Sequence, residues 1–359
     1  ALTVKNDTSA PVRQLASVSQ NEHKIVAQPL LPLPKGQAGA KTRVFTTDAA
    51  LQIAPVGAER LPGPLRSFEG IGNVDRLLPP DTNGDVGPNH YVQMVNSTFS
   101  IFNKSGALLA GPTAINQLWG GAGTRCGTRN DGDPVVVYDQ MADRWLLSQF
   151  VSASPYYICV AISQTANPQG AYYTYDFSVT ELPDYFKFGA WPDAYYMSSN
   201  ESTYGAYAFN RTRMLQGLSA TYVKFTGQTN FLMPADVDGP TAPPANAAGT
   251  FYTFKDNSYS GHGGGVDRLE VFQLVPDFTT PAQSTFPLVS PNPPSTHPHT
   301  LCGLFVMNCK PQPGTTPQHQ PPHPPGRGAV FPPGDAAGGR NRPAPPHGPT
   351  RRCRRPGPA

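Results

Sequence analysis

The stretch DGDPVVVYDQMADRWLLSQF, residues 131–150, decides the fold class of this chain. It contains a Gly-Asp-Pro turn, a Val-rich run, a polar turn and a second apolar run that begins beside Trp145. Short runs rich in Val, Tyr and Phe between turn residues are typical of β-strands. Residues 156–177, YYICVAISQTANPQGAYYTYDF, add two more such runs. The segment therefore predicts four consecutive short strands.

The same alternation of strand and turn extends over residues 66–290. We find no amphipathic helical pattern longer than about three turns, so helix is expected in less than about a tenth of the chain. Aromatic residues make up 10% of the sequence and charged residues only 14%, which also favours β-structure. The remaining strand candidates are HYVQMVN (90–96), FSIFNKSG (99–106), DAYYMSSN (193–200), GAYAFNR (205–211), TYVKF (221–225), TFYTF (250–254) and RLEVFQL (268–274).

An aspartate recurs ahead of these strand groups. Asp85, Asp133, Asp193 and Asp238 are 48, 60 and 45 residues apart. A period of 40–60 residues with several strands in each unit is typical of a β-propeller. We therefore predict an all-β, propeller-like fold of about four blade units, either complete or part of a larger propeller.

Residues 131–177 resemble a blade of the secreted bacterial propellers of the sialidase and BNR-repeat type. The resemblance is carried by Asp133, Pro134, Trp145, Ser163, Pro168 and Gly170. In addition, WPDAYYMSSNE (191–201) resembles the inner strands of propeller glycosidases that act on arabinans and related glycans. The resemblance covers about residues 70–290 and implies an exported protein that acts on glycans. The chain has no full Asp-box and no clear arginine triad, which argues against a sialidase.

Inner strands of propeller blades meet at a central channel, so residues at matching places in the blades point into one cavity. On this basis Asp133, Asp193 and Asp238 are the predicted catalytic carboxylates, because a pair of them could divide acid and base roles in glycoside cleavage. Predicted sugar-stacking residues are Tyr138, Trp191, Tyr195 and Tyr196. The alternative for each aspartate is a turn residue that bonds its own backbone.

The loop DTNGDVG (81–87) is a candidate calcium site. Oxygen ligands would come from Asp81, Asn83 and Asp85. An EF-hand is excluded, because Gly84 precedes Asp85 and position twelve of the loop is Val92. A plain turn remains the alternative. The sequence calls for no other cofactor.

Three zones differ in composition. Residues 1–65 are interrupted by Pro and Gly and predict an extended arm or a propeptide-like linker, and residues 66–309 form the predicted propeller body. Residues 310–359 predict a disordered, basic, Pro-rich tail, because they have few apolar side chains to bury. The abrupt change of composition also suggests a reading-frame slip. The tail holds eight Lys and Arg residues, which leaves 19 basic and 23 acidic residues, a net charge of −4, in residues 1–309.

The five cysteines lack the spacing of a zinc site. They are either buried thiols or disulfides, and the disulfide alternative pairs Cys126 with Cys159 and Cys302 with Cys309, leaving Cys353 over. A disulfide-bonded protein would be secreted or located at the cell surface.

Two functions remain open at this stage. The first is an exported, glycosidase-type hydrolase acting on an extracellular polysaccharide or glycoconjugate. The second is a non-catalytic adhesin or lectin-like module that binds a cell-surface polymer. In either case we expect a monomer with no nucleic-acid partner and no membrane span, since the body is mildly acidic and no apolar run reaches 18 residues.

Overall fold

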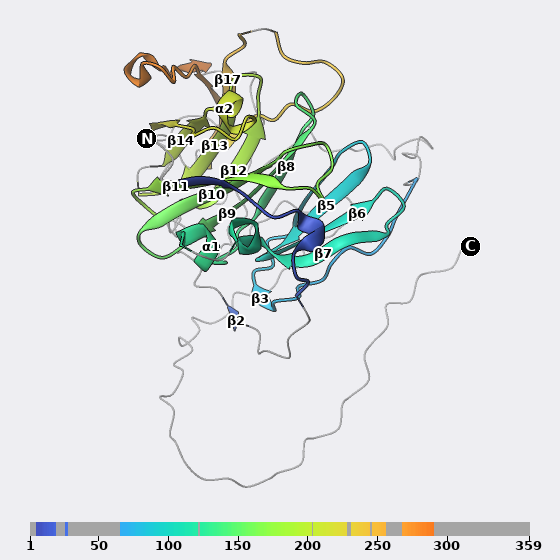
Figure 1. Cartoon of the computed structure of the whole chain (residues 1–359). Coiled ribbons are helices and arrows are strands. Elements are labelled where there is room, and N and C mark those ends of the chain that lie inside the picture. Colours follow the sequence, from blue (N-terminus) through green and yellow to red (C-terminus); the bar gives the residue numbers. More distant parts are fainter. Residues whose placement is uncertain are drawn as a thin grey trace, which may run out of the picture. The chain divides into compact units, whose positions relative to one another are not determined.

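Four antiparallel sheets follow one another along the chain in the computed structural model of this protein (Figure 1). The structure describes residues 5–18, 26–27, 65–120, 123–202, 204–227, 231–244, 246–255 and 268–290. The chain divides into two compact units, Ala1–Pro313 and Gly314–Ala359, and all described residues belong to the first. The predicted tail, residues 310–359, and Cys302, Cys309 and Cys353 lie outside the described residues.

The first two sheets contain residues 83–114 and residues 135–179, which include the stretch that decided the fold class. Sheet 1 contains β4 (Asn83–Val86), β5 (His90–Val95), β6 (Thr98–Asn103) and β7 (Leu108–Ala114), paired in chain order. Sheet 2 contains β8 (Val135–Asp139), β9 (Arg144–Val151), β10 (Tyr156–Ser163) and β11 (Tyr172–Val179), with β1 (Lys5–Thr8) added outside β11. Residues 131–177 therefore do form four consecutive strands.

Sheets 3 and 4 repeat this order. Sheet 3 contains β12 (Asp184–Ala190), β13 (Tyr195–Asn200), β14 (Gly205–Phe209) and β15 (Tyr222–Phe225). Sheet 4 contains β16 (Met233–Pro234), β17 (Gly249–Lys255), β18 (Arg268–Leu274) and β19 (Leu288–Ser290). WPDAYYMSSNE was expected to be an inner strand, but its strand portion is β13, the second strand of sheet 3.

The remaining elements are short. Strands β2 (Val26–Ala27) and β3 (Leu77–Leu78) form a small parallel pair. The described α-helices are α1 (Arg125–Thr128) and α2 (Arg211–Met214), and 3-10 turns lie at Val12–Gln14, Ile115–Trp119 and Pro281–Gln283. The low helix content expected from the sequence is confirmed for the described residues. None of the described helices has the length and hydropathy needed to cross a membrane.

The first strands of successive sheets lie side by side and run in the same direction. Asn83 and Asp85 of β4 accept hydrogen bonds from the backbone of β8, at Val136 (2.7 Å) and Tyr138 (2.7 Å). At the other end of the series, Val237 N donates to Ala190 O at the end of β12 (3.2 Å). The first two bonds align β4 with β8, and the third brings the end of β12 beside the segment after β16. Strands β8 and β12 are also neighbours, with Asp133 and Lys187 interacting near their starts.

Hydrophobic cores fill the spaces between neighbouring sheets. Val136 and Leu147 pack toward sheet 1, whereas Val135 and Leu146, one residue away on the same strands, pack toward sheet 3. A third core joins sheets 3 and 4 around Tyr196. Side chains of a strand alternate between its two faces, so a sheet that is covered on both faces needs an almost continuous apolar run. This explains the unbroken VVV and YYICVAI sequences.

The turn after β10 packs against Trp145. Trp145 is 1% exposed. Its backbone N–H donates to Ser163 Oγ (2.8 Å), and its indole Nε1 donates to Ala166 O (3.2 Å). Trp145 lies beside the start of a strand in a Val-rich run, a position that predicts a buried side chain, and this prediction is confirmed. The Ser163–Gly170 turn caps one end of sheet 2.

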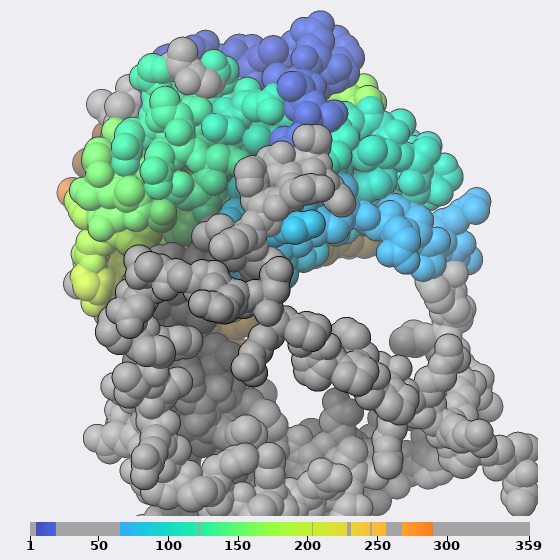
Figure 2. Space-filling model, turned by 90° about the horizontal axis from the view of Figure 1, so that it is seen from below, coloured from blue at the N-terminus to red at the C-terminus, as the bar shows by residue number. Residues whose placement is uncertain are grey.

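A segment near the N-terminus packs on the body instead of forming an arm. Strand β1 pairs with β11, from Lys5 opposite Asp176 to Thr8 opposite Tyr173. Val12 is 1% exposed and belongs to the core between sheets 1 and 2. In Figure 2 residues 5–18, in dark blue, lie over the cyan and green parts of the surface. The predicted arm is therefore wrong for residues 5–18.

Candidate functional site

At the start of each first strand, one non-glycine residue has the left-handed backbone conformation, with a positive φ angle. The φ angles are 42° at Asp81, 49° at Asp133, 51° at Tyr185 and 57° at Phe231. Three of these residues lie two positions before β4, β8 and β16, and Tyr185 lies two before Lys187, where regular pairing of β12 resumes after a bulge. Non-glycine residues seldom adopt this conformation, and such residues gather at functional sites. The entry positions therefore form one repeated feature.

Three carboxylates and one lysine lie near enough to interact at these entries. Asp81 and Asp133 share a side-chain hydrogen bond, and Asp184 and Lys187 interact electrostatically with both. We call Asp81, Asp133, Asp184 and Lys187 the entry cluster. Its members come from the starts of three consecutive first strands, so the alignment of sheets 1, 2 and 3 places them together.

The charges of the entry cluster perturb one another. Burial raises the pKa of Asp133 to about 7, and the negative charges of Asp81 and Asp184 add to this effect. Burial also raises the pKa of Asp81 and of Asp184, although Lys187 opposes the shift in both cases. Two adjacent carboxylates cannot both ionise easily, so the Asp81–Asp133 pair retains a proton near neutral pH.

Lys187 and two aromatic rings complete this end of the sheets. Lys187 Nζ donates to Phe186 O (3.0 Å) and lies 4.0 Å from the centre of the Tyr185 ring. Burial lowers the pKa of Lys187. Tyr185 is 45% exposed and packs edge-on against Phe231, with ring centres 6.2 Å apart. One oxygen of Asp81, Oδ2, is buried without a hydrogen-bond partner. This end therefore combines a proton-holding acid pair, a cation and a partly exposed ring.

An open cleft lies beyond the opposite ends of β12 and β16. Its volume is about 460 Å³. Two of the predicted site residues, Trp191 after β12 and Asp238 after β16, line this cleft together. Asp236 lines it as well. We call it the tryptophan cleft. The other residues that line it are Val237, Thr241, Pro243, Pro244, Ala247, Ala248, Thr250 and Gln273.

The predicted catalytic aspartates occupy three different environments. Asp133 belongs to the entry cluster and Asp238 to the tryptophan cleft, at opposite ends of the first strands. Asp193 lies in the turn between β12 and β13, where it accepts a hydrogen bond from Tyr196 Oη (2.8 Å). The aspartate repeat aligned Asp133, which precedes a first strand, with Asp85, which lies within one, and with Asp193 and Asp238, which lie between a first and a second strand. The expected single ring of these carboxylates is wrong for this reason.

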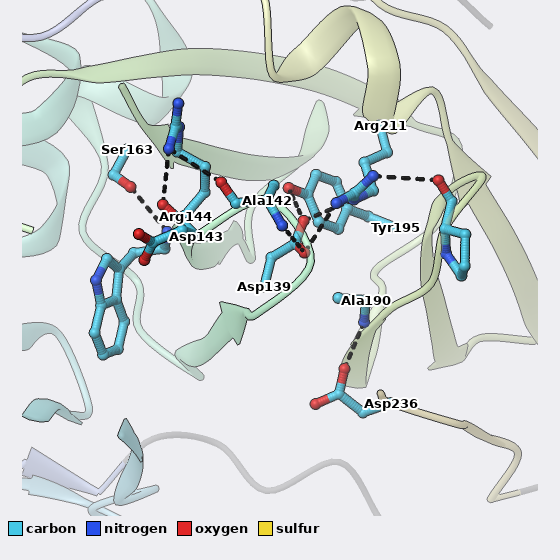
Figure 3. Close-up of polar contacts among 11 residues, drawn as sticks. Asp139, Ala142, Asp143, Arg144, Ser163, Ala190, Tyr195, Arg211 and Asp236 are labelled. Carbon is cyan, nitrogen blue, oxygen red and sulfur yellow. Dashed lines mark hydrogen bonds and ion pairs between the residues drawn. The ribbon is translucent and has the colours of Figure 1, made fainter. Parts of the chain in front are cut away.

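Two of the predicted stacking residues are core residues. Tyr195 and Tyr196 are both fully buried, so neither ring offers a face to a ligand. Tyr195 Oη donates to Asp139 Oδ2 (2.8 Å), as Figure 3 shows. Tyr138 is partly buried against Trp145, with ring centres 4.9 Å apart, and its hydroxyl bonds Asp143. Trp191 lies beside a Tyr-rich strand, a position that predicts a largely buried side chain, but it is only partly buried. It alone among the four borders the cleft.

The predicted calcium ligands serve the joint between sheets 1 and 2. The side-chain oxygens of Asn83 and Asp85 accept backbone N–H groups of β8, and Asp81 bonds Asp133. Within the described ranges no three His, Cys, Asp or Glu side chains are grouped so as to hold a metal ion. The arrangement does not present Asp81, Asn83 and Asp85 as a calcium-binding set.

Asp184 and Lys187 were missed by the sequence reasoning. Asp81, Asp133 and Asp184 are 52 and 51 residues apart, a more regular repeat than the one proposed from the sequence. The disulfide alternative for one cysteine pair, in contrast, is confirmed, because Cys126 and Cys159 are bonded.

Comparisons with known proteins leave the family open. No family model matches the chain, and no curated protein matches it. Among the solved structures that match is a glycosyl hydrolase from Bacteroides ovatus, with 9% sequence identity and a TM-score of 0.29, covering 57% of this chain and 68% of that one. A likeness at this level carries no argument about function.

Proposed function

We propose that the chain is an exported β-propeller hydrolase that cleaves a glycan at the entry cluster. Four consecutive antiparallel sheets with aligned first strands support the propeller, whether complete or part of a larger ring. The Cys126–Cys159 disulfide supports export, because disulfides persist mainly in oxidising compartments. The observation that carries the proposal is the meeting of Asp81, Asp133, Asp184 and Lys187 at the strand entries.

Each member of the cluster has a role in this proposal. Asp133 is the general acid, because it is the carboxyl that holds a proton near neutral pH. It would give that proton to the glycosidic oxygen as the bond to the anomeric carbon breaks. Asp184, whose negative charge Lys187 stabilises, would take a proton from the attacking water. Asp81 keeps the proton on Asp133 before the reaction.

A specific observation also favours a second function, that of a non-catalytic binding module. Asp85 and Asp236 bond backbone amides of neighbouring sheets, at Tyr138 and Ala190, and therefore act as scaffold residues. A propeller scaffold serves unrelated functions in different proteins. In this alternative the entry cluster would bind a ligand without cleaving it.

The two functions are separated by a hydrolysis screen. The purified chain is incubated with a panel of polysaccharides and glycoconjugates, and new reducing ends are measured. Asp133→Asn and Asp184→Asn should each lower the rate at least about 100-fold, in line with the usual contribution of acid–base groups. The matched control is Asp7→Asn, because Asp7 lies in an exposed ion pair with Lys5 at 3.6 Å.

Binding of a glycan without release of reducing ends would favour the binding module. Hydrolysis that survives both entry-cluster substitutions would overturn the assignment of the site. Unchanged circular dichroism and melting temperature in each variant exclude loss of the fold as the cause.

A further inference from the structure

The tryptophan cleft is a pre-formed recess with a fixed aromatic wall. Trp191 Nε1 donates to Ala247 O (2.8 Å), and Ala247 N donates to Pro244 O (3.0 Å), so the indole and the loop opposite hold each other in place. Apolar side chains of Pro243, Pro244 and Ala248 line the same space. Ligand sites in proteins commonly combine such walls with a few polar groups.

The base of the cleft is anchored to two neighbouring sheets. Asp236 Oδ1 accepts the N–H of Ala190 at the end of β12 (2.6 Å), as Figure 3 shows. Gln140 Nε2, beyond the end of β8, donates to Gly239 O (2.7 Å). The segment that carries Asp236 and Asp238 is therefore held from both sides.

The cleft has an excess of negative charge. Its two charged lining residues are Asp236 and Asp238, and Asp85 of β4 lies near enough to repel both. No Lys, Arg or His is present among the described residues that line it. Withdrawal from water raises the pKa of Asp236 to about 6, with the charges of Asp238 and Asp85 contributing. A cation in the cleft would relieve this repulsion.

The lining favours an organic cation over a metal ion. Asp85, Asp236 and Asp238 do not make a metal-binding group, and an indole face attracts ammonium groups through its π-electrons. Thr241, Thr250 and Gln273 add hydroxyl and amide groups that can bond sugar hydroxyls. We propose that the tryptophan cleft is a second binding site, and that it takes a glycan unit bearing a free amino group. This site stands whether or not the entry cluster is catalytic.

The proposal is tested by calorimetric titration at pH 7 with an oligomer of glucosamine and with the matching oligomer of N-acetylglucosamine. Acetylation removes the positive charge and leaves the ring hydroxyls, so the free amine should bind at least about 10-fold more tightly. Asp238→Asn and Trp191→Ala should each weaken glucosamine binding by a similar factor. Asp236→Asn, which keeps an oxygen for Ala190 N–H, should do the same.

Two controls keep the result specific to the cleft. Asp7→Asn, which alters an exposed ion pair on β1 away from both sites, should leave glucosamine binding unchanged. Butylamine should bind at least about 10-fold more weakly than glucosamine, since it has the cation without the hydroxyls.

Equal affinity for the acetylated and free oligomers would overturn the proposal. So would unchanged affinity in Asp238→Asn with its melting temperature preserved, or equal binding of butylamine and glucosamine.

Discussion

Asp139 and Arg211 form a two-point ion pair that joins sheets 2 and 3. Arg211 Nε donates to Asp139 Oδ2 (2.6 Å) and Nη2 donates to Oδ1 (2.9 Å), as Figure 3 shows. The aspartate side chain is 0% exposed and the arginine side chain 9%. Tyr195 Oη completes the group from β13. The pair thus links the end of β8 to α2 in a setting that excludes water.

Removing one partner of this pair should be costly. Arg211→Leu leaves the Asp139 carboxylate buried without a counter-charge, and we expect a loss of about 3–5 kcal/mol in the free energy of unfolding. The measurement is urea unfolding. The control is Lys5→Ala, which breaks an exposed pair and should cost less than about 1 kcal/mol. A loss as small as that control would show that the Asp139–Arg211 pair contributes little.

Gly189 should tolerate no side chain. A Cβ at this position of β12 would lie 2.3 Å from Ala235 O, a backbone atom of the next sheet. Gly189→Ala must therefore push β12 and β16 apart, and we expect a loss of about 1–3 kcal/mol or more. Gly72→Ala is the matched control, since nothing lies within 4 Å of its Cβ position. Equal melting temperatures for the two variants would contradict the close approach of these strands.

Trp145 should matter much more for stability than Trp191. Trp145→Ala removes a 1% exposed side chain from the core between sheets 1 and 2, and should cost about 3–5 kcal/mol. Trp191→Ala should cost less, because that ring borders the tryptophan cleft. Thermal unfolding followed by near-ultraviolet circular dichroism measures both. A larger loss for Trp191 would mean that the cleft is filled by protein.

The disulfide should add stability by restricting the unfolded chain. Cys126 and Cys159 are separated by 33 residues, and closing a loop of this size is worth about 3–4 kcal/mol. We expect the double variant Cys126→Ala, Cys159→Ala to lose about that amount. Adding a reductant should destabilise the parent chain and leave the double variant unchanged. A parent chain that is insensitive to reductant at its unfolding midpoint would contradict this.

Asp133 should make stability depend on pH. Its pKa is raised to about 7 in the folded chain, so between about pH 4 and pH 7 the folded state binds a proton that the unfolded state has released. The free energy of unfolding should therefore fall as the pH rises through this range. Asp133→Asn removes the effect, and should be more stable than the parent by about 1–3 kcal/mol at pH 8. The two chains should converge near pH 4.

If the free energy of unfolding of parent and variant depended on pH in the same way between about pH 4 and pH 7, the proton-sharing Asp81–Asp133 pair would be contradicted. The comparison isolates the Asp81–Asp133 pair, because carboxyls outside the pair whose pKa values are raised, such as Asp236, titrate in both chains.

The strands predicted from the sequence are mainly those buried on both faces. Runs such as VVV in β8 and YYICVAI in β10 are unbroken because cores cover both sides of their sheet. First strands β4, β12 and β16 were not predicted. Their sequences, NGDV, DYFKFGA and MP, carry Gly, Pro or charged residues and show no simple period. Their polar groups are required because Asn83 and Asp85 bond the neighbouring sheet.

Only part of the candidate site was predicted, because the sequence revealed some of the strands beside it and not others. Asp133 was recognised because a clear strand follows it, whereas Asp184 precedes a strand that sequence patterns did not reveal. Tyr195 and Tyr196 were misassigned because a tyrosine that packs in a core and one that stacks on a sugar look alike in sequence. Only their position on the second strand of sheet 3, between two cores, separates these uses.

The pairing of β1 with β11 also sets an order of assembly during synthesis. Residues 5–18 leave the ribosome long before Tyr172–Val179 exist, and at about 5–20 residues per second the wait is on the order of ten seconds. Through that interval β1 has no partner strand and Val12 has no core to enter. Sheet 2 is completed only when β1, which is synthesised early, pairs with β11, which is synthesised late. A shortened version lacking residues 5–18 would leave the outer edge of β11 open to strands of other molecules.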